Sequence, residues 1–249
     1  MSIVNNFNRR IDAQISVDYK NDGSIKKRKE KSLPPKDKKQ ANEILDLLWQ
    51  QNQVLSLCCL MQSLTGLRYS DASWLKYSDF YDEFGKLKPF FDLCQQKSFR
   101  MRIGRKRAKP MTQSDAFRKS LVRVYTNEAI EHVIADCKHL NPHSELLFPN
   151  SRSRVLLEDG TVIERPMSVD SADWHLNKVK RQLKLGFTLG THSWRKFFAL
   201  MLVRKGASLE KIRDLLGHDN IVSTNSYLHT FIDDVEQYTK TLRLDLDED

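Results

Sequence analysis

Two arginines, two histidines and a tyrosine are spaced along this 249-residue chain in a way that could act on a phosphodiester. The segment THSWR holds His192 and Arg195, LLGH holds His218, and Tyr227 stands nine residues beyond that histidine. Arg68 lies far upstream, in TGLRYSD. Guanidinium groups bind phosphate oxygens through paired hydrogen bonds, imidazoles move protons, and a phenol can serve as a nucleophile. The set therefore indicates DNA cleavage through a covalent tyrosine link, with no metal or other cofactor required.

These side chains need rigid elements to hold them. His192 and Arg195 are three residues apart on a helix expected to begin at Thr191, so both should project from one side of it. The apolar residues beside them should anchor that helix in the core; they are Trp194, Phe197, Phe198, Met201 and Leu202. His218 directly follows Gly217, which is expected to end another helix. Asp71 is close enough in sequence to orient Arg68.

Apolar periodicity predicts a mainly helical fold with a small antiparallel sheet, an α+β arrangement. A helical pattern begins at Gln40 and ends at Thr65 and Gly66, and Ser70 is expected to cap a short helix that includes Trp74 and Leu75. Further helices are expected over 126–137, 168–185, 191–206, 208–217 and 235–242, and around Tyr227.

Two short runs, Phe90 to Leu93 and Leu121 to Tyr125, have strand character and should pair. The residues between them, SFRMRIGRKRAKPMTQSDAFRKS, are expected to form a long, extended basic loop. Residues 151–166 should form a second hairpin that turns at Asp159 and Gly160.

Charge is strongly polarised along the chain, whose formal net charge is +9. Residues 96–123 hold ten lysines and arginines against one acid, and residues 1–40 hold eleven against five. Residues 233–249 reverse this balance, with seven acids and two bases. A polyanionic partner is expected, and double-stranded DNA fits best. The loop residues expected to contact DNA are Arg100, Arg102, Arg105, Lys106, Arg107 and Lys109.

Other features narrow the class of protein. The four cysteines lack CxxC spacing, which indicates reduced thiols and no zinc site; they are Cys58, Cys59, Cys94 and Cys137. No apolar run approaches about 20 residues, and the N-terminus lacks the apolar core of a signal peptide. We therefore expect a cytoplasmic, nucleoid-associated protein with no membrane partner.

The order and spacing of the motifs resemble the tyrosine recombinase family, also called the phage integrases. TGLRYSDASWLKYSDF is similar to the first box of the family, and the residues from THSWR to NSY are similar to its second box. The similarity extends from Lys39 to Leu242, which corresponds to the catalytic domain of the family.

The resemblance implies a role for each residue. Arg68 and Arg195 would clamp the scissile phosphate, and Tyr227 would attack it to give a 3′-phosphotyrosine and a free 5′-hydroxyl. His192 would accept the proton of the phenol, and His218 would donate a hydrogen bond to the phosphate. A lysine of the family protonates the leaving oxygen; QQKSF resembles its site and makes Lys97 the candidate, with Lys106 and Lys119 as rivals.

The resemblance also implies a site-specific recombinase that acts as a tetramer on DNA. Residues 39–249 would form the catalytic domain with an acidic tail that could dock on a neighbouring subunit. Residues 1–38 are expected to be a basic arm, too short for the helical N-terminal domain of the family, which an accessory protein could replace. Two alternatives stay open: a type IB-like topoisomerase, and a DNA-binding regulator that keeps the fold without cutting.

Overall fold

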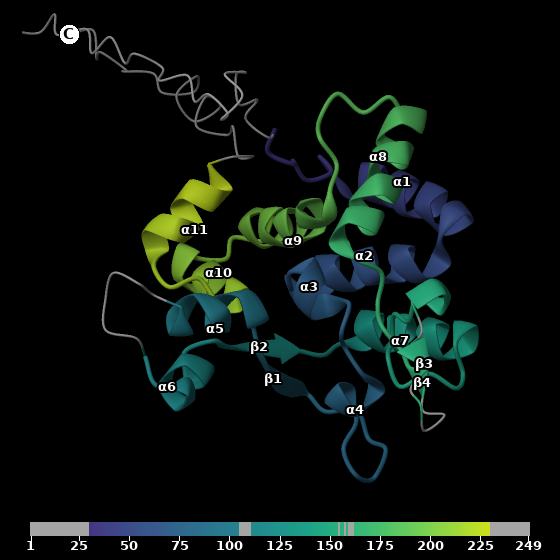
Figure 1. Ribbon diagram of the computed structural model, residues 1–249. Helices are drawn as coiled ribbons and strands as arrows, with labels where there is room; N and C mark the ends of the chain where they lie inside the picture. Colours follow the sequence, from purple (N-terminus) through teal and green to yellow (C-terminus); the bar gives the residue numbers. More distant parts are fainter. Residues whose placement is uncertain (1–29, 105–110, 154, 157, 159–161, 230–249) are drawn as a thin grey trace, which may run out of the picture. The chain divides into compact units, whose positions relative to one another are not determined.

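The computed structural model describes residues 30–104, 111–153, 155–156, 158 and 162–229. The chain divides into two units, Met1–Lys31 and Ser32–Asp249. Most of the predicted basic arm, the turn at Asp159 and Gly160, and the predicted helix over 235–242 lie outside the described residues. All helices and strands of the described residues belong to the second unit (Figure 1).

The second unit is mainly helical, as the sequence predicts. Its first part holds α1 (Lys38–Gln51), α2 (Gln53–Thr65), α3 (Tyr69–Ala72), α4 (Tyr77–Phe80), β1 (Phe90–Cys94), α5 (Gln96–Ile103), α6 (Gln113–Arg118), β2 (Leu121–Tyr125) and α7 (Glu128–Leu140). Its second part holds a 3₁₀ turn (Ser151–Ser153), β3 (Val155–Leu156), β4 (Val162–Ile163), α8 (Val169–Gln182), α9 (Thr191–Arg204), α10 (Leu209–Leu216) and α11 (Ile221–Leu228).

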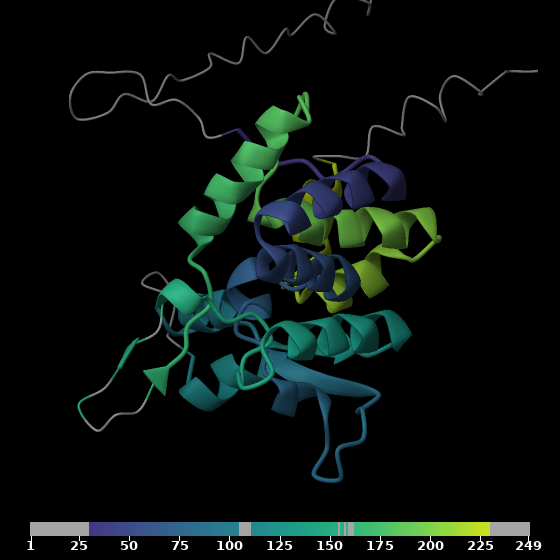
Figure 2. The ribbon, with the colours of Figure 1, turned by 90° about the vertical axis from the view of Figure 1, so that its right-hand side faces the viewer.

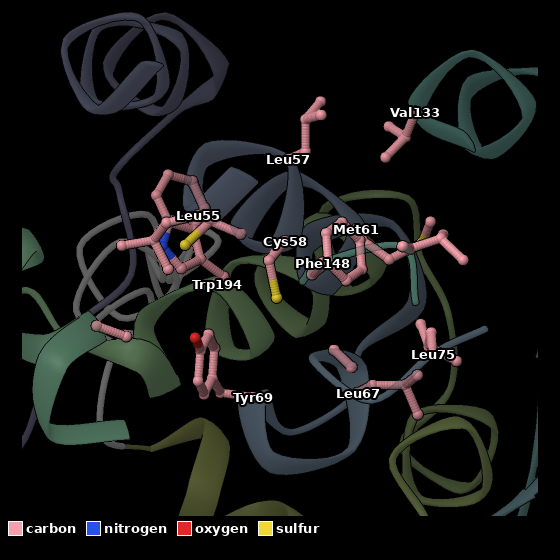
Figure 3. Packing of buried hydrophobic residues seen from close by; sticks show 14 of the residues in the cluster. Leu55, Leu57, Cys58, Met61, Leu67, Tyr69, Leu75, Val133, Phe148 and Trp194 are labelled. Carbon is pink, nitrogen blue, oxygen red and sulfur yellow. The ribbon is translucent and has the colours of Figure 1, made fainter. Parts of the chain in front are cut away.

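Helix α2 is the centre of the packing. It is apolar on most of its surface and lies against α1, α7 and α9. Figure 3 shows its residues Leu55, Cys58 and Met61 among Trp194 of α9 and Phe148. A helix buried on several sides makes a rigid base, because close-packed interiors resist displacement. The segments that extend from α2 and α9 are therefore held in place by the core.

Local signals account for most helix boundaries. Asn52 ends α1 and also caps α2, accepting a hydrogen bond from the backbone N–H of Leu55 at 2.8 Å. Ser208 caps α10, as its position before an amphipathic run predicts, and Ser168, where the sequence predicts the start of a helix, caps α8. Two other helix starts differ from expectation. Asn127 rather than Thr126 caps α7, and Arg68 rather than Ser70 directly precedes α3. Helix α3 ends at Ala72, so the predicted helical positions of Trp74 and Leu75 are wrong.

The predicted small sheet is confirmed. Strands β1 and β2 pair antiparallel, with Phe90 opposite Tyr125 and Cys94 opposite Leu121. Strands β3 and β4 form a separate hairpin, with Val155 opposite Ile163, and this hairpin extends away from the helices (Figure 2).

The connection between β1 and β2 is not the extended loop expected from its basic composition. It contains α5 and α6, with residues 105–110 between them outside the described residues. Glutamine, lysine, arginine and methionine all favour helix, and Gly104 follows the last turn of α5. Figure 1 shows α5 and α6 at the end of the β1–β2 pair that lies near α10. The prediction of a loop underestimated these local preferences.

Candidate active site

The turn after α2 brings Arg68 to a cavity. The helix ends at Gly66, whose left-handed backbone has φ of +71°. A Cβ atom there would lie 2.5 Å from the ring of Phe198, so the position has room only for glycine. The guanidinium of Arg68 donates to the side-chain oxygen of Gln95. It also lines a cavity of about 260 Å³.

The start of α9 is held at several points. The backbone N–H of Thr191 donates to Asp173 of α8 at 2.7 Å. The buried amide of Gln62, from α2, donates to the carbonyl oxygens of Leu67 and Thr191 at 3.1 and 3.2 Å. Gln62 thereby joins the turn that carries Arg68 to the helix that carries Arg195, and this fixes the spacing between the two motifs.

Arg195 lies deep in the interior, with 2% of its surface exposed. Its two terminal nitrogens donate to the carbonyl oxygens of Gly66 and Leu216, each at 2.6 Å. Burial lowers the pKa of Arg195 to about 10, and the charge of Arg68 adds to this effect. The side chain therefore remains cationic at neutral pH. Two of its five N–H donors are used by backbone, so the others are left for further acceptors.

His218 is fixed by the end of α10. Gly217, whose φ is +62°, ends that helix, and the backbone N–H of His218 donates to the carbonyl oxygen of Arg213 at 3.1 Å. The Nδ1 atom of His218 lies 3.0 Å from the hydroxyl oxygen of Thr224 in α11. The ring is therefore held from two helices at once.

The surroundings of His218 keep its ring uncharged. Burial, followed by the charges of Arg195 and Arg68, lowers the pKa of His218 to about 4. The imidazole is therefore neutral at pH 7. Its Nε2 is not engaged by the bond to Thr224 and can take part in another hydrogen bond.

Tyr227 lies on α11 against these groups. Its ring meets the ring of His218 edge to face, with centroids 5.3 Å apart, and the ammonium nitrogen of Lys196 lies 5.6 Å from its centroid. Burial raises the pKa of Tyr227 to about 12. The charges of Arg195 and Arg68, and a hydrogen bond with Arg195, act in the opposite direction. The phenol thus lies where both arginines act on its protonation.

His192 and Lys97 complete the set. His192 lies at the start of α9 with part of its side chain exposed, but the surrounding protein removes enough water from its ring to lower its pKa. The charges of Arg195, Lys97 and Arg68 lower it further. Lys97 is exposed and lines the same cavity as Arg68 and His218. It is the second residue of α5, although the strand-like run FFDLCQQ before it predicts an extended backbone up to this position. The structure therefore brings the six predicted side chains together from the turn before α3, from α5 and α9, from the turn after α10, and from α11.

The other lysines and arginines of the basic segment differ in how exposed their side chains are. Arg100 is exposed on α5, as a DNA contact requires. Arg102 is 6% exposed and is bonded to Ser120 and to Asp219, so it is an internal ion pair rather than an open basic side chain. Lys119 is exposed beside a second cavity, which His218 and Asp219 also line. Arg105, Lys106, Arg107 and Lys109 lie outside the described residues.

The contacts of Arg68 differ from those that the sequence predicts. Asp71, expected to orient Arg68, accepts a hydrogen bond from the backbone N–H of Gln96 at 3.1 Å, and burial raises its pKa. Its charge still raises the pKa of Arg68, so the two groups interact electrostatically. Gln95 takes the contact with Arg68. Sequence reasoning missed Gln95, because a glutamine between a strand and a basic segment carries no signal of burial or of a partner.

Comparison with known proteins shows the family and the fold. The model of the phage integrase family matches residues 36–233, and the chain belongs to that family. A tyrosine recombinase XerC of Halalkalibacterium halodurans is 26% identical over 177 residues, which cover 71% of this chain and 50% of that protein. A tyrosine recombinase XerC of Rickettsia bellii is 43% identical over 61 residues, which cover 24% of this chain and 20% of that protein. The chain thus spans half or less of the length of these relatives.

Solved structures show the same fold. The crystal structure of XerA recombinase matches with a TM-score of 0.56 and 16% identity, over 88% of this chain and 68% of that one. A lambda integrase dimer bound to a COC′ core site matches with a TM-score of 0.55 and 16% identity, over 90% of this chain and 52% of that one. The predicted fold class is therefore confirmed.

Two features are absent from the described residues, a cluster of metal ligands and a membrane-spanning helix. Within those ranges, no group of three or more histidine, cysteine, aspartate or glutamate side chains is arranged to hold a metal ion. No helix among them is long and apolar enough to cross a membrane.

Proposed function

We propose that this chain is a site-specific DNA recombinase that cleaves and rejoins strands through a 3′-phosphotyrosine. The observation that carries the proposal is the position of the Tyr227 ring against His218, with ring centroids 5.3 Å apart, where the charges of Arg195 and Arg68 both act to lower the pKa of the phenol. Two guanidiniums that act on a phenol can stabilise a phenolate and a phosphate together, which is what attack on a phosphodiester requires. Family membership supports the same reaction.

In the cleavage step, the oxygen of Tyr227 forms a bond to phosphorus while the bond from phosphorus to the 5′-oxygen breaks. Arg68 and Arg195 neutralise the charge that builds on the non-bridging oxygens. His192 accepts the phenolic proton, and its lowered pKa keeps it unprotonated and ready to do so at neutral pH. His218 donates from Nε2 to the phosphate, because Nδ1 is taken by Thr224.

The leaving 5′-oxygen needs a proton, and Lys97 is the proposed donor. Its support is its place on the wall of the cavity that Arg68 and His218 also line. Rejoining is the reverse: the 5′-hydroxyl attacks the phosphotyrosine, Lys97 takes its proton back, and His192 returns the phenolic proton. The ester energy is kept in the protein link, so no nucleotide hydrolysis is needed.

The substitution Tyr227→Phe tests the proposal. Nicked suicide substrates made from candidate recombination sites should trap a covalent adduct with the native chain and none with this variant, because phenylalanine lacks the attacking oxygen. DNA affinity should stay nearly unchanged. The matched control is Tyr125→Phe, which removes a phenolic oxygen from an exposed ring on β2 and should leave adduct formation intact.

Three other outcomes of this experiment would each contradict part of the proposal. Adducts that persist in Tyr227→Phe would refute the assignment of the nucleophile. Binding by the native chain with no adduct on any site would favour a regulator that does not cut. Relaxation of supercoiled plasmid by the monomer, without sequence preference, would favour a topoisomerase.

We further propose that double-stranded DNA is the partner and that the active assembly is a tetramer on DNA, aided by an accessory protein and located at the nucleoid. Support for the DNA partner comes from the concentration of positive charge over residues 96–123, where Arg100 is exposed. Contacts of lysine and arginine with phosphates make affinity fall steeply with salt, by about 0.9 in log–log slope for each phosphate neutralised. Sedimentation with and without DNA would test the assembly.

A further inference from the structure

Gln95 has an unusual position for a neutral polar residue. It is 1% exposed and stands between the end of β1 and the start of α5. Its backbone is fixed on both sides: its N–H donates to the carbonyl oxygen of Ser120 at 2.9 Å, and its carbonyl oxygen accepts from the N–H of Phe99 at 3.0 Å. The side chain therefore projects from a rigid junction of the sheet and the helix.

The side-chain amide of Gln95 connects the two arginines. Its oxygen accepts a hydrogen bond from Arg68, and its nitrogen donates to the carbonyl oxygen of Leu216 at 3.1 Å. The same carbonyl oxygen accepts from Arg195 at 2.6 Å. A continuous chain of hydrogen bonds thus runs from Arg68 through Gln95 and the Leu216 carbonyl to Arg195.

The partners of Gln95 fix the direction of its amide. An arginine only donates and a carbonyl oxygen only accepts, so the amide oxygen must face Arg68 and the amide nitrogen must face Leu216. A carboxylate at this position could accept from Arg68, but it would repel the carbonyl oxygen on its other side. Glutamine is the side chain of this length that satisfies both neighbours.

A neutral acceptor matters because the two arginines repel each other. The charge of Arg68 lowers the pKa of Arg195, and both guanidiniums are needed as cations at a phosphate. An acidic partner would orient Arg68 but would also cancel much of its charge. The charge of Asp71 already acts on Arg68 and raises its pKa. The amide of Gln95 orients Arg68 without adding a second negative charge, so the positive charge remains available for DNA.

The absence of a side chain at Gly217, in the turn before His218, leaves space for the amide of Gln95. A Cβ atom on Gly217 would lie 3.0 Å from the side-chain oxygen of Gln95 and 3.2 Å from its nitrogen. Gly217 therefore serves two purposes: its φ of +62° ends α10, and its missing side chain admits Gln95. The amide thus also contacts the turn from which His218 extends.

We propose that Gln95 is a positioning residue, which sets Arg68 relative to Arg195 and the His218 turn without reducing the charge that binds the scissile phosphate. This inference deepens the proposed function and rests on it. Gln95 itself does not contact the reacting atoms; its effect passes through Arg68 and through the carbonyl oxygen of Leu216.

The test compares Gln95→Met and Gln95→Glu with the native chain in single-turnover cleavage of a suicide substrate at saturating DNA. Gln95→Met keeps the length of the side chain and loses both hydrogen bonds. It should slow cleavage by about 100-fold, the order expected when a group at the reacting centre is displaced by about 1 Å. DNA affinity should change by only a few fold, since most phosphate contacts lie elsewhere.

The control variant is Ser56→Ala, which removes one hydrogen bond between α1 and α2, from a buried hydroxyl to the carbonyl oxygen of Leu45. It should lower the melting temperature without slowing cleavage by the folded protein. If Gln95→Met behaves in the same way, Gln95 is only structural and the proposal is overturned. Should Gln95→Met fail to fold, Gln95→Glu carries the test, because it keeps the shape of the side chain.

Gln95→Glu tests the role of charge. On ordinary DNA it should cleave more slowly than Gln95→Met, because its carboxylate offsets the charge of Arg68. On a substrate with a neutral methylphosphonate at the scissile position, its deficit relative to the native chain should shrink, since less positive charge is needed there. An equal deficit on both substrates would refute the role of the neutral amide.

A double-mutant cycle links Gln95 to Arg68. In an Arg68→Ala background, Gln95→Met should have little further effect on cleavage, whereas independent effects would multiply. Failure of this inference and failure of the proposed function give different results. If the native chain cleaves and Gln95→Met cleaves equally fast, only the inference falls. If the native chain cleaves no site at all, the proposed function falls and the inference falls with it.

Discussion

The substitution Gly66→Ala should destabilise the protein more than an ordinary glycine replacement. Gly66 has φ of +71°, which costs an alanine roughly 1–2 kcal/mol. A Cβ atom there would also lie 2.5 and 2.6 Å from two ring atoms of Phe198, so the ring or the turn must move. Forcing extra volume into a packed interior costs about 1–3 kcal/mol. The sum, about 2–5 kcal/mol, is a large part of the 5–15 kcal/mol typical of a folded domain.

Gly206→Ala is the matched control. Gly206 has φ of +75°, and a Cβ atom there would meet no other atom within 4 Å. This variant has the same backbone penalty without the clash. The difference between the two free energies of unfolding, measured in urea, therefore isolates the clash at about 1–3 kcal/mol.

The Gly66 variant should also lose activity beyond its loss of stability. The carbonyl oxygen of Gly66 accepts a hydrogen bond from Arg195 at 2.6 Å, so movement of the turn displaces a guanidinium at the proposed site. Cleavage by the folded fraction of Gly66→Ala should therefore be slower than that of Gly206→Ala. The reasoning is wrong if the two variants are equally stable, or if they cleave at equal rates.

Two further predictions concern the turn that carries His218. The pKa of His218 is about 4 in the folded chain and about 6.5 in the unfolded chain, so the unfolded chain takes up the proton first as the pH falls. The free energy of unfolding should therefore be highest above pH 6.5 and decrease as the pH drops toward 4. A shift of this size corresponds to about 3 kcal/mol, and solvent screening of the partly exposed ring reduces the expected decrease to about 1–2 kcal/mol. Urea titrations across this range should show a weaker pH dependence in His218→Asn, and an unchanged slope would contradict the assignment. Arg102→Leu should cost about 1–3 kcal/mol, because it leaves the half-exposed carboxylate of Asp219 without its buried partner. Arg123→Leu breaks an exposed pair with Asp92 and should have little effect on the same measurement.

Much of the fold could be predicted because its signals are local. Leu121 to Tyr125 alternates apolar and polar residues, and this strand is confirmed at the predicted bounds. Gly206 and Gly217 follow the ends of α9 and α10, as their positions after amphipathic runs indicate. Ser168 and Ser208 act as caps for the same reason, since a hydroxyl can accept a hydrogen bond from the N–H groups that a helix leaves free at its start.

The inward position of Arg102, in the segment between β1 and β2, shows where local signals fail. The positive charges of this segment suggested an extended loop, but α5 forms with Arg102 turned inward. A buried arginine is stable only where acceptors surround it, and those acceptors, Ser120 and Asp219, come from distant parts of the chain. The residues around Arg102 in the sequence do not indicate that Ser120 and Asp219 will be its partners.

The amino-acid sequence alone determined the family, the positions of most helices and strands, and the chemical types of Arg68, His192, Arg195, His218 and Tyr227. These properties depend on residue type and short-range spacing. Only the tertiary structure decided which acceptors hold each charged group: the carbonyl oxygens of Gly66 and Leu216 for Arg195, and the amide of Gln95 for Arg68. The physical reason is that the free energy of a buried charge depends on every polar atom around it, and the fold collects those atoms from segments far apart in the chain.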